Sequence, residues 1–220
     1  MEREQLDYFS KIKFVEVASF LAGPSVGMFF AELGSQVIKI ENRKTNGDVT
    51  RQWKTSHESP SARNSAYYAS VNWGKKVLFL DLTQKSDQKA LHVLLKDADV
   101  LVSNHSLRQQ KVLGIDADVL TSICPTIIHA NVTGFGEEDE RRAFDLVLQA
   151  ESGFMSINGS AKTGPLKMPV ALIDVLAAHQ MKEAILVALH KRSSEGQYIG
   201  VSLYNTAVSA LTNQASNYLM

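Results

Sequence analysis

Two patterns of hydrophobic and polar positions alternate along most of the chain. Short apolar runs bounded by turn residues predict buried strands, and apolar residues spaced three or four apart predict amphipathic helices. The predicted strands cover residues 14–17, 36–40, 77–82, 100–103, 126–132 and 198–203. The predicted helices cover residues 26–33, 85–95, 117–122, 144–152 and a long segment that follows Asp174.

Because strands alternate with helices, the pattern predicts an α/β fold. The expected architecture is Rossmann-like and doubly wound, a mostly parallel sheet with helices on both faces. Gly34 is placed to end the first helix. In such sheets ligands bind beyond the carboxyl ends of the strands. Those ends are expected at residues 19–24, 41–43, 103–105 and 133–136.

Two polar stretches interrupt the pattern. Residues 41–72 form a long connection rich in Ser, Asn and Arg, with a strong turn signal at Asn46-Gly47-Asp48. A connection of this length is typical of a functional loop or a surface excursion. Residues 156–164 are expected to be a flexible segment.

Basic residues gather near the predicted strand ends, and two interpretations stay open. They bind the phosphates of a nucleotide-like ligand, or they are ordinary solvated surface charge. The residues are Lys39, Arg43, Lys75, Lys76, Arg108 and Lys111.

Asp174 lies where a short apolar run gives way to a helix. Such junctions in α/β proteins are exposed and geometrically fixed, so they commonly carry chemistry. The competing interpretation is a helix N-cap, whose carboxylate accepts hydrogen bonds from free backbone N–H groups. This stretch alone favours the cap.

Composition narrows the possible functions. The 220 residues carry no formal net charge, which gives no support for binding to nucleic acid or to a membrane surface. No apolar run approaches the roughly 20 residues of a membrane span. Cys124 is the single cysteine, so no intrachain disulfide is possible; a structural thiol and a cytoplasmic protein are expected. Neither a GxGxxG loop nor a common metal-binding motif is present.

Several segments together resemble the family III CoA-transferases, the group that includes formyl-CoA and carnitine CoA-transferases. Their order and spacing carry the resemblance, which runs from Phe14 to Leu219. The final match is P-x₃-P-x₄-D from Pro165 to Asp174. The other matching stretches are VEVASFLAGPSVGMFFAELGSQVIKIE, GDVTR, SVNWGKKVLFLDL, KDADVLVSN, CPTIIHANVTGFG, FDLVLQAESGFM and GQYIGVSLYN.

The resemblance implies that Asp174 is a nucleophile. In such an enzyme CoA moves from an acyl-CoA to an acceptor carboxylic acid through an aspartyl anhydride and an aspartyl-CoA thioester. CoA is then a substrate, and no cofactor is tightly bound. By matched position, the implied CoA-binding residues are Ser19, Leu21, Ala22, Asn42, Arg43, Asn72, Lys75, Asn104, His105, Thr133 and Phe135.

The sequence departs from the family pattern at several positions. Pro169 and Ala178 stand where the family usually has glycine, and Val112 stands where a basic residue is common. The turn after the fifth strand has become acidic, from Phe135 to Glu140. These changes bear on affinity for CoA more than on the fold.

Family members are about twice as long as this chain and form interlocked homodimers. The resemblance therefore implies that residues 1–200 form the Rossmann-like large domain. Residues 201–220 would form a helix that leads to the linker of a second, smaller domain. The chain is either a fragment or a natural half-length relative, and a homodimer is the expected assembly.

Two other functions stay open. A racemase of the same superfamily would need a histidine directly before Asp145, but that residue is Phe144, which argues against racemisation. The other alternative is a truncated or degenerate domain that binds CoA without catalysis. The changes at Pro169 and Ala178 and the short chain support it.

Overall fold

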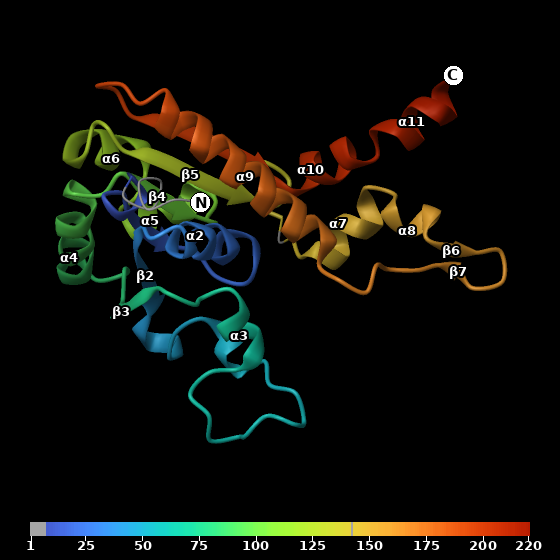
Figure 1. The fold of residues 1–220 in the computed structure, drawn as a ribbon, viewed down its shortest axis with the longest axis horizontal. Helices are drawn as coiled ribbons and strands as arrows, with labels where there is room; N and C mark the ends of the chain where they lie inside the picture. The colour runs from blue at the N-terminus through green and yellow to red at the C-terminus, as the bar shows by residue number, and fades with distance from the viewer. Residues whose placement is uncertain (1–7, 142) are drawn as a thin grey trace.

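A six-stranded parallel sheet forms the centre of the protein (Figure 1). The computed structural model describes residues 8–141 and 143–220. The strand order β3-β2-β1-β4-β5-β8 is that of a doubly wound nucleotide-binding fold, so the predicted Rossmann-like architecture is confirmed. The strands are β1 (Lys13–Val17), β2 (Gln36–Asn42), β3 (Lys76–Leu80), β4 (Val100–Ser103), β5 (Ile128–Thr133) and β8 (Gln197–Ser202).

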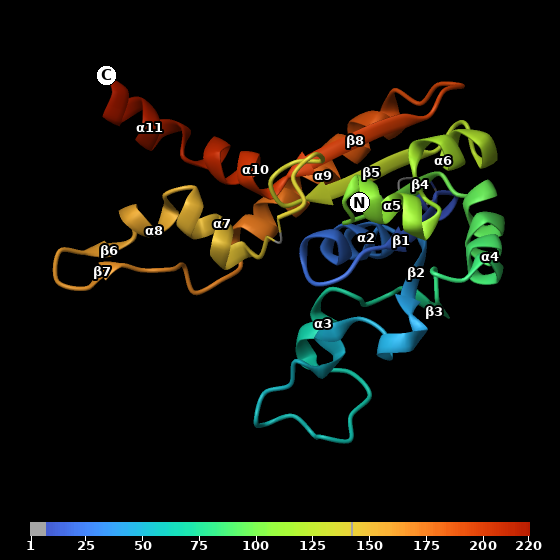
Figure 2. The same ribbon diagram turned by 180° about the vertical axis from the view of Figure 1, so that it is seen from behind.

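Helices cover both faces of the sheet, each over its own apolar cluster. Side chains alternate between faces along a strand, so in β1 Phe14 joins one cluster while Val15 and Val17 join the other. The Phe14 cluster includes residues of α2 (Ala22–Glu32), α7 (Asp145–Glu151), α9 (Leu172–His190) and α10 (Leu203–Ala210). The opposite cluster includes residues of α4 (Lys85–Lys96) and α6 (Ala117–Ile123). Figure 2 shows β5 and β8 side by side at one end of the sheet.

The predicted elements are present, with bounds that differ by a few residues. Gly34 follows α2 with a φ of 100°, the conformation that favours glycine after a helix. Cys124 is buried beside the Ala98 carbonyl, as expected of a structural thiol. The elements in the loops that were not predicted include η1 (Arg43–Thr45), η2 (Val49–Gln52), α3 (Ala66–Ser70) and α5 (Leu107–Leu113).

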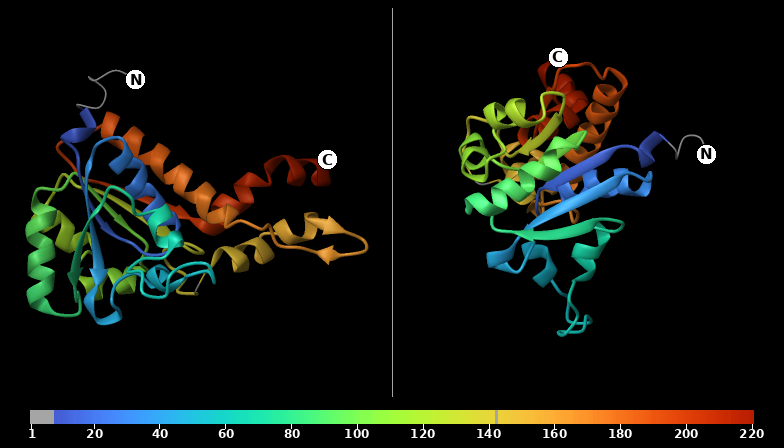
Figure 3. Two further views of the ribbon diagram at one scale, coloured as in Figure 1. Left: turned by 60° about the horizontal axis from the view of Figure 1, so that its bottom comes forward. Right: turned by 90° about the vertical axis from the view of Figure 1, so that its left-hand side faces the viewer.

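Two arms extend from the body of the protein (Figure 3). One holds α8 (Phe154–Ile157) and an antiparallel hairpin of β6 (Gly159–Ser160) and β7 (Gly164–Pro165), in the segment expected to be flexible. The other is α11 (Thr212–Leu219), which follows α10. Across residues 8–141 and 143–220, none of the helices has the length and apolar character of a membrane span.

We expect Gly27→Ala to destabilise the protein, although alanine normally stabilises a helix interior relative to glycine. A Cβ at this position in α2 would overlap Oε2 of the buried Glu16 and lie 3.3 Å from Cε of Lys75. Overpacking of this kind lowers the free energy of unfolding by about 1–3 kcal/mol. Urea unfolding measures the effect, with Ser25→Ala in the same helix as control. A stabilised Gly27→Ala would show that α2 lies further from Glu16.

Candidate active site

A cavity of about 620 Å³ opens at the carboxyl ends of β1, β4 and β5, beside the first turn of α9. Its size is typical of a small-molecule site, and it lies where doubly wound sheets bind ligands. The structure brings several of the predicted site residues to this cavity. They are Ser19, Ala22, Asn104, His105, Thr133 and Asp174.

Reciprocal hydrogen bonds fix the cavity walls at the ends of β1 and β4. The amide of Asn104 donates to the Ser19 carbonyl over 2.9 Å, and the Ser19 N–H donates to Asn104 Oδ1 over 3.2 Å. Asn131 of β5 holds the next residue in the same way, through the N–H and C=O of His105. Burial lowers the pKa of His105. At neutral pH a neutral imidazole and the amide of Asn104 therefore line this wall.

Asp174 lies in the first turn of α9, which begins at Leu172 with Ala171 as its N-cap residue. The N-cap interpretation is therefore wrong, because Asp174 lies inside the helix and its side chain caps no N–H group. Within the described part of the chain, its carboxylate has no hydrogen bond or ion pair with another side chain. Burial, followed by the negative charge of Asp145, raises the pKa of Asp174 to about 7.

Asp145, the first residue of α7, faces this turn. Its Oδ2 accepts hydrogen bonds from the N–H of Ile173 over 2.6 Å and from the N–H of Asp174 over 3.2 Å. Gln149, one turn further along α7, donates to Asp145 Oδ1 and to the Val170 carbonyl. The Met168 N–H donates to Gln149 Oε1 over 2.8 Å. Residues 168–174 are thus held against α7 by two side chains.

Aromatic rings surround the approach to Asp174. Phe20, with an unusual φ of 73°, contacts Phe144 and Trp53 at ring distances of 5.7 and 5.9 Å. Trp53 in turn contacts Tyr67 at 5.1 Å. Burial and the charge of Asp174 raise the pKa of the Tyr67 phenol. Aromatic side chains therefore form this side of the approach to Asp174.

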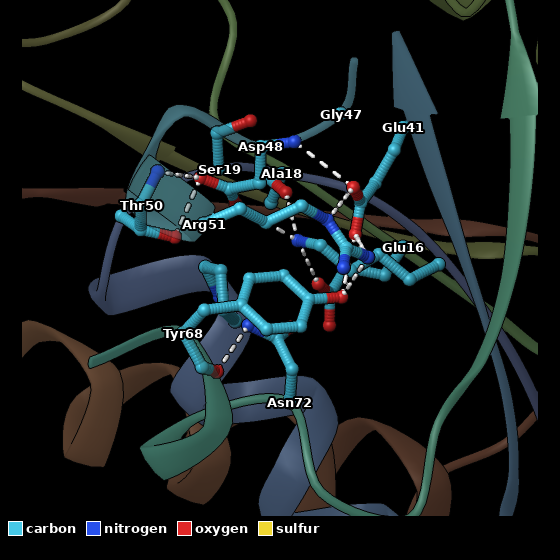
Figure 4. A network of polar contacts seen from close by, with 12 residues as sticks. Glu16, Ala18, Ser19, Glu41, Gly47, Asp48, Thr50, Arg51, Tyr68 and Asn72 are labelled. Carbon is cyan, nitrogen blue, oxygen red and sulfur yellow. Dashed lines mark hydrogen bonds and ion pairs between the residues drawn. The ribbon is translucent and has the colours of Figure 1, made fainter. Parts of the chain in front are cut away.

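A buried ionic network links β1, β2 and the polar segment 41–72 (Figure 4). Lys39 and Glu16 face each other across β2 and β1, with 2.9 Å between the ammonium and Oε1. The same ammonium lies 3.2 Å from Asp48 and donates to the Ala18 carbonyl over 2.6 Å. Burial would lower the pKa of Lys39, but Glu16 and Asp48 hold it above its ordinary value. One lysine thus links the sheet, the cavity loop and the long connection.

Arg51 ties the long connection to β2 in the same network (Figure 4). Its Nε and Nη2 donate to both oxygens of Glu41, over 2.6 and 2.7 Å. Tyr68 donates to Glu41 over 2.6 Å. Burial would raise the pKa of Glu41, but these hydrogen bonds hold it below its ordinary value. The polar segment 41–72 is therefore anchored on the sheet.

Several predicted site residues do not line the cavity. Asn42 is the N-cap of η1, and Arg43 forms a 2.7 Å ion pair with Asp87 at the surface. Leu21 is the N-cap residue of α2. Phe135 packs against the core beneath the Arg141 guanidinium.

Lys75 and Asn72 also lie away from the cavity. The Lys75 ammonium is fully buried, 2.7 Å from Glu16, and donates to Asn72 and to the Pro24 carbonyl. Burial lowers the pKa of Lys75 to about 8. Lys39 is buried as well, so these two members of the basic cluster are neither solvated nor free for phosphate in this structure.

The structure adds cavity residues that the sequence did not single out. They include Phe20, Gln109 and Arg141, and also Phe144, which the sequence raised only against a racemase. Asp145 contacts the first turn of α9 beside the cavity. Phe20 lies between the predicted residues Ser19 and Leu21, but no sequence motif indicated that it would line the cavity. Arg108, known only as one of the basic cluster, also lines the cavity. In residues 8–141 and 143–220, no group of three or more His, Cys, Asp or Glu residues could hold a metal ion.

Comparison with known proteins assigns the family. The model of CoA-transferase family III matches residues 9–220. A succinate–glutarate CoA-transferase of Agrobacterium fabrum is 35% identical over 219 residues, which cover 96% of this chain and 54% of that protein. The human succinyl-CoA:glutarate CoA-transferase is 30% identical over 214 residues, covering 95% and 48%.

The solved structures agree with this assignment. A CAIB/BAIF family protein from Brucella suis has a TM-score of 0.87 and 34% identity, over 94% of this chain and 56% of that chain. This chain thus spans about half the length of the relatives that it matches. The match nevertheless covers nearly all of its own residues, and the chain belongs to CoA-transferase family III.

Proposed function

We propose that this chain carries the nucleophile of a CoA-transferase that moves CoA from an acyl-CoA to a carboxylic acid. The observation that carries the proposal is the Asp174 carboxylate. It is half-buried, lies at the end of a ligand-sized cavity and has a pKa raised to about 7. A carboxylate without hydrogen-bonded partners is more nucleophilic than a solvated one, and at neutral pH a large part of it is ionised.

The proposed reaction proceeds through covalent intermediates. An oxygen of Asp174 attacks the thioester carbonyl carbon, and the carbon–sulfur bond breaks. CoA departs as a thiolate, and Asp174 and the acyl group are joined as a mixed anhydride. The thiolate attacks the Asp174 carbonyl and releases the first carboxylate, which leaves an aspartyl-CoA thioester. The acceptor carboxylate then attacks this thioester and expels the thiolate. Attack of the thiolate on the new acyl carbonyl gives the product acyl-CoA and restores Asp174.

The walls of the cavity would hold the CoA. Ser19, Ala22, Asn104, His105 and Thr133 line the cavity and would contact the pantetheine arm or the thioester. Arg43 directly follows β2, the strand beside β1, and is exposed. It would reach a phosphate of CoA if its ion pair with Asp87 opened.

The remaining predicted residues would act from behind the cavity or at its edges. Leu21, Asn42 and Phe135 would shape the neighbouring loops. Lys75 and Asn72 would support the α2 end of the cavity through Glu16 and Pro24.

The assembly and the location are parts of the same proposal. We expect a cytoplasmic homodimer. The substrates would be an acyl-CoA and a small carboxylic acid, in line with the names of the relatives. A second candidate is a domain that binds CoA without turnover. The residues that favour it are Pro169 and Ala178, which stand near Asp174 where the family usually has glycine.

Intact-protein mass spectrometry after incubation with a panel of acyl-CoAs tests the proposal. We expect a CoA-sized mass increase that hydroxylamine removes and that peptide mapping places within residues 167–182. A folded protein that forms no adduct with any donor would contradict the transferase and favour the binding domain.

The rate of adduct formation is expected to rise with pH through a midpoint near 7. Only the ionised carboxylate attacks, and the raised pKa of Asp174 means that it is mostly protonated below this midpoint. Below pH 6 the rate should fall about tenfold per pH unit. Adduct formation followed from pH 5 to 9 measures this profile. A rate that is flat down to pH 5 would show an Asp174 of ordinary acidity.

A further inference from the structure

We propose that Asp145 is a positioning residue for Asp174, a role that rests on the proposed function of Asp174. It holds the first turn of α9 and occupies the backbone N–H groups that would otherwise stabilise the Asp174 carboxylate. The carboxylate of Asp145 and the two N–H groups come from segments 28 residues apart in the chain. Their meeting is therefore a tertiary contact between α7 and α9.

The first turn of a helix presents N–H groups without partners inside the helix, and these carry the positive end of the helix dipole. An aspartate in this turn is normally stabilised as an anion, which lowers its pKa. In α9 the N–H groups of Ile173 and Asp174 both donate to Asp145 Oδ2. These two N–H groups are thus occupied by the Asp145 carboxylate. The Asp174 carboxylate is left desolvated and without them, and its pKa is raised.

Gln149 keeps Asp145 in place. Its side-chain amide donates to Asp145 Oδ1 and to the Val170 carbonyl, and its oxygen accepts the Met168 N–H. Gln149 is only 1% exposed, so water does not compete for these hydrogen bonds. A fixed Asp145 oxygen in turn fixes the direction of the α9 backbone and hence of the Asp174 side chain.

The other charged groups around Asp174 do not replace this contact. From α3, the Tyr67 phenol faces the same carboxylate. The charged or titratable groups of the cavity are His105, Arg108, Asp139, Glu140 and Arg141.

The elements that pack against α9 carry other charged or titratable groups, but Asp145 is the one whose charge raises the pKa of Asp174. Glu32 of α2 faces Lys182 further along α9, and α10 has no charged residue. His129 of β5 and Tyr198 of β8 contact each other. Asp145 is the group that contacts the Asp174 backbone directly.

The test follows the side-chain carboxyl carbon of Asp174 by NMR in the full chain with ¹³C-labelled aspartate, assigned by comparison with Asp174→Asn. The wild-type midpoint is expected near 7. In Asp145→Asn the side-chain oxygen still accepts the two N–H groups but the charge is gone, so the midpoint shifts downwards. Glu151→Gln removes an exposed charge from the same helix without contacting α9, and it should leave the midpoint unchanged. Asp145→Ala also removes the acceptor and frees the two N–H groups for Asp174, so its midpoint should fall further than that of Asp145→Asn. Equal midpoints in Asp145→Ala and the wild type would overturn the proposal.

Amide hydrogen exchange in the wild type gives a second test that needs no variant. First-turn N–H groups normally exchange fast, but those of Ile173 and Asp174 should be protected. Fast exchange at both would overturn the proposal, even if Asp145→Asn failed to fold. Neither readout uses an acyl-CoA, so a protein that forms no CoA adduct would refute the proposed function and leave this contact standing.

Discussion

Asp174→Asn is expected to abolish the covalent CoA adduct. The amide is nearly the same size as the carboxylate but is not a nucleophile, so the first carbon–oxygen bond cannot form. We expect a loss of at least about 10³-fold in the rate of adduct formation, the scale seen when a nucleophile is removed. Stability should change little or increase, because a desolvated carboxylate next to Asp145 is replaced by a neutral group.

Asp139→Asn is the matched control for this result. Asp139 lines the same cavity but its carboxylate pairs with Arg141, so the variant should keep the adduct. The measurement is the intact mass after incubation with the donor that labels the wild type. An adduct of undiminished yield in Asp174→Asn would assign the nucleophile to another residue.

Lys39→Met is expected to cause the largest loss of stability. It leaves the carboxylate of Asp48 without its ion pair and that of Glu16 with Lys75 as its remaining partner, both in the interior. Removal of one partner from a buried ion pair costs about 3–5 kcal/mol. The variant also loses the hydrogen bond to the Ala18 carbonyl, which precedes the cavity residue Ser19.

Lys76→Met provides the comparison for Lys39→Met. Lys76 is exposed on the neighbouring strand β3, and its replacement should change the free energy of unfolding by under about 0.5 kcal/mol. Guanidinium unfolding of both variants measures the difference. If Lys39→Met were as stable as Lys76→Met, the ionic network would contribute nothing to holding residues 41–72 on the sheet.

The sequence pattern predicted the sheet well because its signals are local. Buried parallel strands read as apolar runs, and Gly34 marks a helix end through its own backbone conformation. The pattern failed for the segment 41–72, where Asp48, Thr50 and Arg51 are buried although polarity predicts the surface. Burial of these residues depends on partners elsewhere in the chain, Lys39 and Glu41, and composition does not specify pairing.

The candidate site also has a part that local sequence signals predicted and a part that depends on tertiary contacts. Ser19, Asn104 and Thr133 were predicted to lie together because the carboxyl ends of parallel strands meet at one edge, and they do line one cavity. Lys39 was misplaced among surface cations. Its position in the middle of a strand opposite Glu16 was the available signal for burial. Asp145 carried no signal at all, since its contact with Asp174 arises only when α7 packs against α9.

The place of β8 in the sheet has a consequence for how the chain folds. β1, β2, β3, β4 and β5 pair in the order 3-2-1-4-5 using the first 133 residues, whereas β8 joins β5 only after a long excursion through α7, α8 and α9. Contacts between distant segments are entropically slow to form. The helix that carries Asp174 lies within that excursion and packs against α2, which is further away in the sequence than the partners of any strand pair in the sheet. The surroundings of Asp174 are therefore expected to form last during folding. A trapped folding intermediate would then contain most of the sheet but lack the proposed site around Asp174.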